Sequence, residues 1–193
     1  MPVDRTSKLE LQHRRLLDGL AASIRQKGLS RTQVSDIVGH ARASRRTFYK
    51  HFPDKDSCLV ELVHRSATTI IESVAAATES DAPLATQIDQ AVDAYLSVLF
   101  GEPELTLALS SPAVGERIIR AQREELERFA EFLVALTPLP SPVSVERAYM
   151  LASGFRAVAL RAIERGDGVA AAGREGKAVF KAVLGTNTTS RKR

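Results

Sequence analysis

The sequence of 193 residues has no tryptophan, a single cysteine and few aromatic residues, and each shortage excludes something. With Cys58 alone, no disulfide can form within the chain, which favours a reducing compartment. Its neighbours Leu59 and Leu62 indicate that Cys58 is a packed core thiol. Aromatic residues make up 5% of the chain, which argues against an aromatic-caged cation site and favours an apolar or weakly polar ligand.

Long apolar runs and strand-like alternation are also missing. No run approaches the roughly 18 apolar residues that a membrane-spanning helix needs. Residues 1–15 are polar and charged, unlike the apolar core of a signal peptide. We therefore expect a soluble, cytoplasmic, all-α protein with no membrane partner.

Motifs of catalysis and metal binding are absent too. The four histidines, His13, His40, His51 and His64, are scattered without the close, acid-partnered spacing of a metal or catalytic site. The glycines form no phosphate-binding loop. The sequence predicts no metal, no cofactor and no enzyme activity.

Positive charge is concentrated at the N-terminal end. The whole chain has a net charge of +4, but residues 1–65 hold 13 lysines and arginines against 7 aspartates and glutamates. A polyanion is therefore expected to bind this end.

Residues 32–55 read as two short helices joined by a tight turn. Thr32 and Ser44 each precede a helical segment and are predicted N-caps. In the first helix, Val34, Ile37 and Val38 have the spacing of one buried face.

The second helix of this pair has two different faces. Phe48 and Phe52, four residues apart, are predicted to be buried together. The opposite side is predicted to be exposed and carries Arg45, Arg46, Tyr49 and Lys50. Arginine can bond both acceptors of a guanine edge, and lysine, tyrosine and histidine reach phosphates, so the pattern indicates DNA binding.

The run Thr32–Ile37 followed by Ser44–Lys55 resembles the helix-turn-helix of the tetracycline-repressor (TetR) family, most specifically over Thr47–Phe52. The resemblance implies a DNA-binding regulator, most often a repressor released from its operator by a small molecule. Two positions depart from the family pattern. The family usually has a small residue at the position of Val38, and it usually has Gly-Val at the positions of Arg42 and Ala43. A left-handed non-glycine residue costs roughly 1–2 kcal/mol. The predicted DNA-binding residues are Thr32, Arg42, Ser44, Arg45, Arg46, Thr47, Tyr49, Lys50, His51 and Lys55.

The remaining chain reads as helix throughout, giving about nine helices in all. Three helices form the head, with the first over 9–27 and closed by Gly28. Asp54 is the predicted N-cap of a fourth helix that ends near Ala77. Further helices are expected over about 84–100, 104–109, 112–136, 143–165 and 169–184. The predicted divisions are a DNA-binding domain over 1–53, a helical regulatory and dimerisation domain over 54–185, and a disordered basic tail over 186–193.

Two glycines on the apolar face of the last helix indicate a close helix approach, because each costs roughly 1 kcal/mol against alanine in a helix interior. Packing within one chain would explain them. A two-fold interface through residues 143–184 would also explain them, and this is how TetR-family proteins usually dimerise. The predicted dimer residues are Phe155, Val169, Gly173, Gly176, Val179 and Phe180.

Tyr95 and Gln122 each interrupt an apolar stripe with a polar group that needs a partner. Structural satisfaction would explain either one. Because similar regulators place a small-molecule site among the middle helices, both are predicted ligand-binding residues.

The sequence thus predicts a homodimeric, sequence-specific transcriptional regulator, most readily a repressor that binds a near-palindromic double-stranded operator and responds to a small-molecule effector. The rivals are a constitutive DNA-binding or architectural protein without an effector, and an all-helical enzyme or scaffold whose head does not read DNA.

Overall fold

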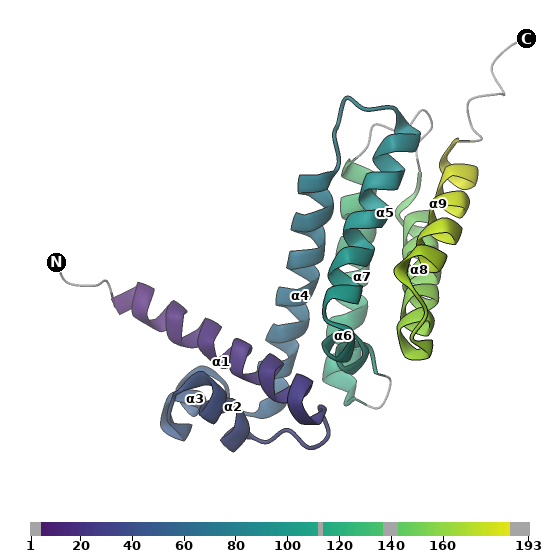
Figure 1. The fold of residues 1–193 in the computed structure, drawn as a ribbon. Coiled ribbons are helices and arrows are strands. Elements are labelled where there is room, and N and C mark those ends of the chain that lie inside the picture. The colour runs from purple at the N-terminus through teal and green to yellow at the C-terminus, as the bar shows by residue number, and fades with distance from the viewer. Residues whose placement is uncertain (1–4, 112–113, 137–142, 186–193) are drawn as a thin grey trace, which may run out of the picture. The chain divides into compact units, whose positions relative to one another are not determined.

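The structure is a computed structural model that describes residues 5–111, 114–136 and 143–185 (Figure 1). Over these residues it contains nine α-helices and no strand, which confirms the all-α prediction. The helices are α1 (Arg5–Lys27), α2 (Val34–Ala41), α3 (Arg45–His51), α4 (Lys55–Ala77), α5 (Leu84–Gly101), α6 (Pro103–Ser110), α7 (Glu116–Leu136), α8 (Val145–Arg165) and α9 (Val169–Gly185). None of the described helices is long and apolar enough to cross a membrane.

The helices belong to two compact units. The first combines the chain up to Arg65 with Ala108–Gln122, and we call it the head. The second combines Ser66–Leu107 with the chain from Arg123 onward, and we call it the body. The functional boundary predicted at residue 53 stays a prediction, since the compact units divide after residue 65. The predicted basic tail over 186–193 and the proline-dense segment over 137–142 lie outside the described residues.

In the head, α1 packs against α2 and α3. A Cβ built on Gly19 would lie 2.5 Å from the Ile37 carbonyl oxygen, so only glycine permits the observed approach of α1 to α2. Gly28 ends α1 with φ 80°, as predicted. The helix begins at Arg5, four residues before the predicted Leu9, because the polar residues ahead of Leu9 continue the same helix.

The second helix does not start as predicted. Its N-cap is Gln33, and the Asp36 carboxylate accepts a hydrogen bond from the Gln33 backbone N–H at 2.7 Å. Thr32 is therefore not the cap. The carboxylate three residues into the helix satisfies the N–H of Gln33, and the Thr32 hydroxyl donates to the Gly28 carbonyl instead of capping α2. A hydrogen bond to the Lys27 ammonium is the main cause that holds the pKa of Asp36 below its usual value.

In the body, α5, α8 and α9 pack together around a core rich in aromatic rings. Tyr95 lies between Phe129 and Phe155, with ring centroids 5.4 and 5.5 Å away. Two ion pairs fasten α9 to α5: Lys177 to Asp93 and Lys181 to Asp89, each at 2.6 Å.

Candidate DNA-binding surface and body cavity

The candidate recognition surface is the exposed face of α3, and the burial of its two faces is as the sequence predicted. Phe48 and Phe52 are buried, with ring centroids 5.6 Å apart. Arg45, Arg46 and Lys50 are exposed, and Tyr49 leaves 57% of its surface exposed while its ring packs edge-on against Phe48. The buried phenylalanines thus fix the orientation of a helix whose outer face is cationic.

The start of α3 is capped as predicted. The Ser44 hydroxyl accepts a hydrogen bond from the Thr47 backbone N–H at 3.0 Å, and the Ser44 and Thr47 hydroxyl oxygens lie 2.9 Å apart. Both predicted DNA-binding hydroxyls therefore already share a contact that stabilises the first turn of α3.

The turn before α3 contains a left-handed arginine. Arg42 has φ 50° and ψ 46°, and it is the only non-glycine residue with positive φ among those described. The conformation closes α2, because the Ala43 backbone N–H donates to the Val38 carbonyl at 2.9 Å. The Arg42 side chain is exposed next to Arg45 and Arg46 in the sequence, so the turn adds a cation to the same end of α3.

Thr32 and Lys55 are placed differently from the phosphate contacts predicted for them. Thr32 is 2% exposed, and its hydroxyl donates to the Gly28 carbonyl at 2.8 Å. The Lys55 ammonium donates to the Thr32 carbonyl at 3.1 Å. The second bond joins Thr32, two residues before α2, to Lys55, the first residue of α4. It holds the two ends of the motif together.

His51 turns toward α1 and away from the exposed face. Its ring lies 5.8 Å from that of His13, and its Nε2 is buried without a hydrogen-bond partner among the described residues. Burial, followed by the positive charges of His13 and Lys50, lowers the pKa of His51. The predicted phosphate contact would require this ring to turn outward.

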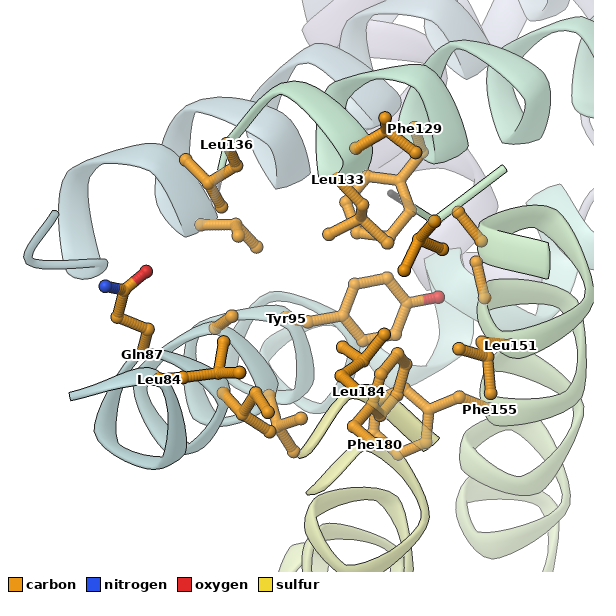
Figure 2. A pocket seen from close by; sticks show the side chains of 18 residues that line it. Leu84, Gln87, Tyr95, Phe129, Leu133, Leu136, Leu151, Phe155, Phe180 and Leu184 are labelled. Atoms are coloured by element: carbon orange, nitrogen blue, oxygen red, sulfur yellow. The ribbon is translucent and has the colours of Figure 1, made fainter. Parts of the chain in front are cut away.

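The body contains a cavity of about 80 Å³ (Figure 2). Its walls come from the last turns of α4, from α5, from the second half of α7, and from α8 and α9. The lining residues are Val74, Leu84, Gln87, Ile88, Ala91, Val92, Tyr95, Phe129, Leu133, Val134, Leu136, Val143, Ala148, Leu151, Ala152, Phe155, Phe180 and Leu184.

Of the two predicted ligand-binding residues, the structure places Tyr95 in this cavity and Gln122 elsewhere. Gln122 belongs to the head, where its amide donates a hydrogen bond to the Leu109 carbonyl. Its polar group is thus paired within the protein, which was the alternative to a ligand-binding role. Gln87 also lines the cavity and was not among the predicted residues, although it interrupts the apolar stripe of Leu84, Ile88 and Ala91 as Tyr95 does.

Most of the predicted dimer residues pack inside the body. A Cβ on Gly176 would lie 2.3 Å from the Phe155 ring, and one on Gly173 would lie 3.4 Å from Leu96. The Phe155 and Phe180 rings meet edge-on at 5.6 Å. Only Val169 and Val179 of the six are exposed. Gly176 therefore serves a close approach within one chain, whereas Gly173 makes only an ordinary contact.

Comparison with known proteins gives one family match. The profile of the family described as "Bacterial regulatory proteins, tetR family" matches residues 16–62, which cover α2, α3 and parts of α1 and α4. Among curated proteins, no sequence matches this chain.

Solved structures share the fold across almost the whole chain. A protein of Mesorhizobium loti described as a TetR-family transcriptional regulator is 21% identical, with a TM-score of 0.69 over 92% of this chain and 97% of its own. FadR of Bacillus subtilis, in complex with stearoyl-CoA, is 16% identical, with a TM-score of 0.71 over 87% and 97%. The fatty acid degradation regulator FadR of Bacillus halodurans is 16% identical, with a TM-score of 0.68 over 94% and 97%.

Proposed function

We propose that the chain is a DNA-binding transcriptional regulator of the TetR family and that it acts as an effector-released repressor, because residues 16–62 match the model of that family. In this proposal a homodimer binds a near-palindromic operator through two copies of α3. A small molecule in the body cavity ends that binding. The observation that carries the proposal is the cationic outer face of α3, which two buried phenylalanines hold in place.

Base readout is assigned to Arg45, Arg46 and Tyr49, and phosphate binding to Lys50. An arginine that bonds both O6 and N7 of a guanine contributes about 1–3 kcal/mol of discrimination. Arg42, at the turn, adds a further cation to this surface. We assign no DNA contact to the side chains of Thr32 and Lys55, because they already bind the backbone of the motif.

The proposed dimer surface is the outer side of α8 and α9. Met150 leaves 66% of its surface exposed and Val179 leaves 48%, so both helices offer apolar surface to a partner. Small residues surround them on the exposed faces, namely Gly154 and Ala157 on α8 and Ala171, Ala178 and Ala182 on α9. Such faces let helices of two chains approach closely, and a two-fold axis then presents two heads to two half-sites.

Two helices provide a route from the cavity to the head. Val74 of α4 and Phe129 of α7 line the cavity, whereas both helices begin in the head. A ligand that displaces either wall would therefore act on a helix that is continuous with the DNA-binding unit. A hundredfold loss of DNA affinity requires only about 2.7 kcal/mol of differential binding between two states.

The test begins by selecting bound sequences from a randomised DNA library with the purified full-length chain. At fixed salt, Arg45→Ala or Arg46→Ala should cost about 1–3 kcal/mol and relax one base preference. Arg123→Ala, which removes an exposed arginine from the body, is the charge-matched control and should leave binding unchanged. If neither head variant alters affinity or base preference, α3 does not read the operator.

A further inference from the structure

The walls of the body cavity carry no charge. None of its 18 lining residues is Asp, Glu, Lys, Arg or His. Moving an ionised group from water into such surroundings without a partner is very costly, so the apolar walls disfavour charged groups. An uncharged occupant pays no such penalty, and apolar surface removed from water contributes about 25 cal/mol per Å².

Only two lining residues offer polar side chains, and they differ in what they already bind. The Gln87 amide nitrogen donates to the Ser80 carbonyl at 3.0 Å and to the Ala82 carbonyl at 2.8 Å. These two bonds use both of its N–H groups. Gln87 thus fastens the α4–α5 connection and has no further donor for a ligand.

Tyr95 is the polar group that remains open to a ligand. It is 6% exposed, and the other residues that line the cavity around it are apolar apart from Gln87. In Figure 2 its ring lies in the middle of the lining residues, with the hydroxyl pointing away from Gln87. The apolar walls around the hydroxyl offer it no hydrogen bond, whereas a ligand oxygen in the cavity would.

The hydroxyl remains a hydrogen-bond donor at every pH at which the protein would be studied. Burial is the main cause that raises the pKa of Tyr95 to about 12. The group is therefore neutral and does not repel an electronegative ligand atom.

The size of the cavity restricts the shape of the occupant. At about 80 Å³ it is smaller than an engineered cavity of about 150 Å³ that admits benzene. A slender chain therefore fits better than a fused ring system. Entry of a longer chain requires rotamer changes in half-buried leucines of the wall, such as Leu133 and Leu151.

We propose that the cavity binds an uncharged, slender apolar molecule whose single hydrogen-bonding oxygen meets the Tyr95 hydroxyl. The inference rests on the proposed function, because it names the chemical class of the effector. The proposed ligand differs from stearoyl-CoA, the ligand in the B. subtilis FadR complex. Stearoyl-CoA carries charged phosphates, and none of the lining residues is cationic.

The test uses three probes of equal chain length, 1-decanol, decanoate and decane, at pH 8 and below their solubility limits. Calorimetry on the full-length protein should show 1-decanol binding more tightly than decane. Decanoate should bind at least tenfold more weakly than 1-decanol. Decanoate binding as tightly as 1-decanol would overturn the proposal, as would no binding of 1-decanol.

Tyr95→Phe isolates the hydrogen bond. This substitution should weaken the binding of 1-decanol by about three- to tenfold and leave the binding of decane unchanged. Tyr149→Phe is the matched control, because Tyr149 is not among the residues that line the cavity, and it should change neither affinity. Equal losses for both probes in Tyr95→Phe would mean that the cavity collapsed, and the assigned bond would be wrong.

A separate measurement distinguishes this inference from the proposed function. Operator binding is titrated with and without saturating 1-decanol. If 1-decanol binds with the expected Tyr95 dependence but operator affinity is unaltered, the ligand class stands and the effector role fails. If the wild-type chain selects no DNA sequence, the repressor proposal fails, and the comparison of the three probes still decides the ligand class.

Discussion

Arg42 combines a strained backbone with an exposed cationic side chain. A non-glycine residue in the left-handed region costs roughly 1–2 kcal/mol, and the resembling family usually has glycine at this turn. The strain accompanies a guanidinium at the same end of α3 as Arg45 and Arg46. We interpret the arginine as a residue that favours DNA affinity at the expense of the free protein's stability.

Arg42→Gly should therefore move stability and DNA affinity in opposite directions. We expect its free energy of unfolding to rise by about 1 kcal/mol, which corresponds to about 2–4 °C in Tm for a chain of this size. Its DNA affinity at low salt should fall, with a shallower salt dependence. Arg42→Lys is the control, because it keeps both the strain and the charge. A glycine variant with unchanged stability would show that the turn is not strained.

His51 predicts a pH dependence of stability. Because burial lowers the pKa of His51 in the folded state, the unfolded chain binds more protons near and below the ordinary value of 6.5. Stability should therefore be fully present above pH 7 and decrease as the pH falls through 6.5 toward the lowered value. Urea unfolding at pH 7.5 and 5.5 measures this difference, and His51→Gln should reduce it. His40→Gln, at an exposed position, should not.

Periodicity predicted both faces of α3 because their residue types differ sharply, phenylalanine inside and arginine outside. It could not locate the cap of α2, where Thr32 and Gln33 both precede the helix and the choice depends on Asp36 bonding the Gln33 N–H. Nor could it predict that His51 turns inward, since that follows from the position of His13 on another helix.

At the scale of elements, α9 has two faces that the sequence pattern alone cannot assign to packing within the chain or to a dimer. Its glycine face and its alanine-valine face are both small and apolar, and sequence alone does not say which one meets the same chain. The structure places Gly173 and Gly176 against the body's own core and leaves Val179 exposed. The proposed dimer interface therefore still uses α8 and α9, but it uses the exposed face of α9 with Val179 in place of the face with the two glycines.

The two glycines of α9 should respond in opposite ways to alanine. Gly173→Ala gains helix propensity of about 1 kcal/mol and makes only an ordinary contact with Leu96, so it should stabilise the protein. Gly176→Ala places a methyl group against the Phe155 ring, which Tyr95 and Phe180 hold in place. Overpacking of this kind costs about 1–3 kcal/mol. Denaturant titrations of both variants test the assignment, and a stabilised Gly176→Ala would contradict it.

At the scale of the whole molecule, a substitution on the exposed side of α9 tests whether the protein dimerises through this helix. Val179→Glu places a charge on this face and should yield monomers with greatly weakened operator affinity. Ser97→Glu, at an exposed position on α5, is the control and should remain dimeric. Sedimentation velocity at micromolar concentration distinguishes the two states. A monomeric wild type would remove the basis for a two-fold operator.

Arg117 should transmit ligand binding to the recognition helix. Its guanidinium donates to the Asp54 carboxylate at 3.1 Å and to the Ser57 hydroxyl at 2.8 Å, where α4 begins. Its own helix, α7, lines the cavity further along. Arg117→Ala should preserve binding of 1-decanol and of operator measured singly, while reducing their mutual effect. Arg120→Ala, which removes the exposed Glu116 pair on α7, is the control.

The head is assembled from two separate stretches of chain, and this restricts how the protein can be cut and recombined. Ile118 and Ala121 are buried residues of the second stretch, so a fragment that stops at residue 65 would lack part of its own interior. We expect such a fragment to aggregate or to need that stretch supplied on a linker. A chimaera that gives this chain another regulator's effector response should accordingly retain residues 108–122 with the head. An exchange of all residues after a single junction would replace residues 108–122 as well, so core residues from two different proteins would have to pack together in the head.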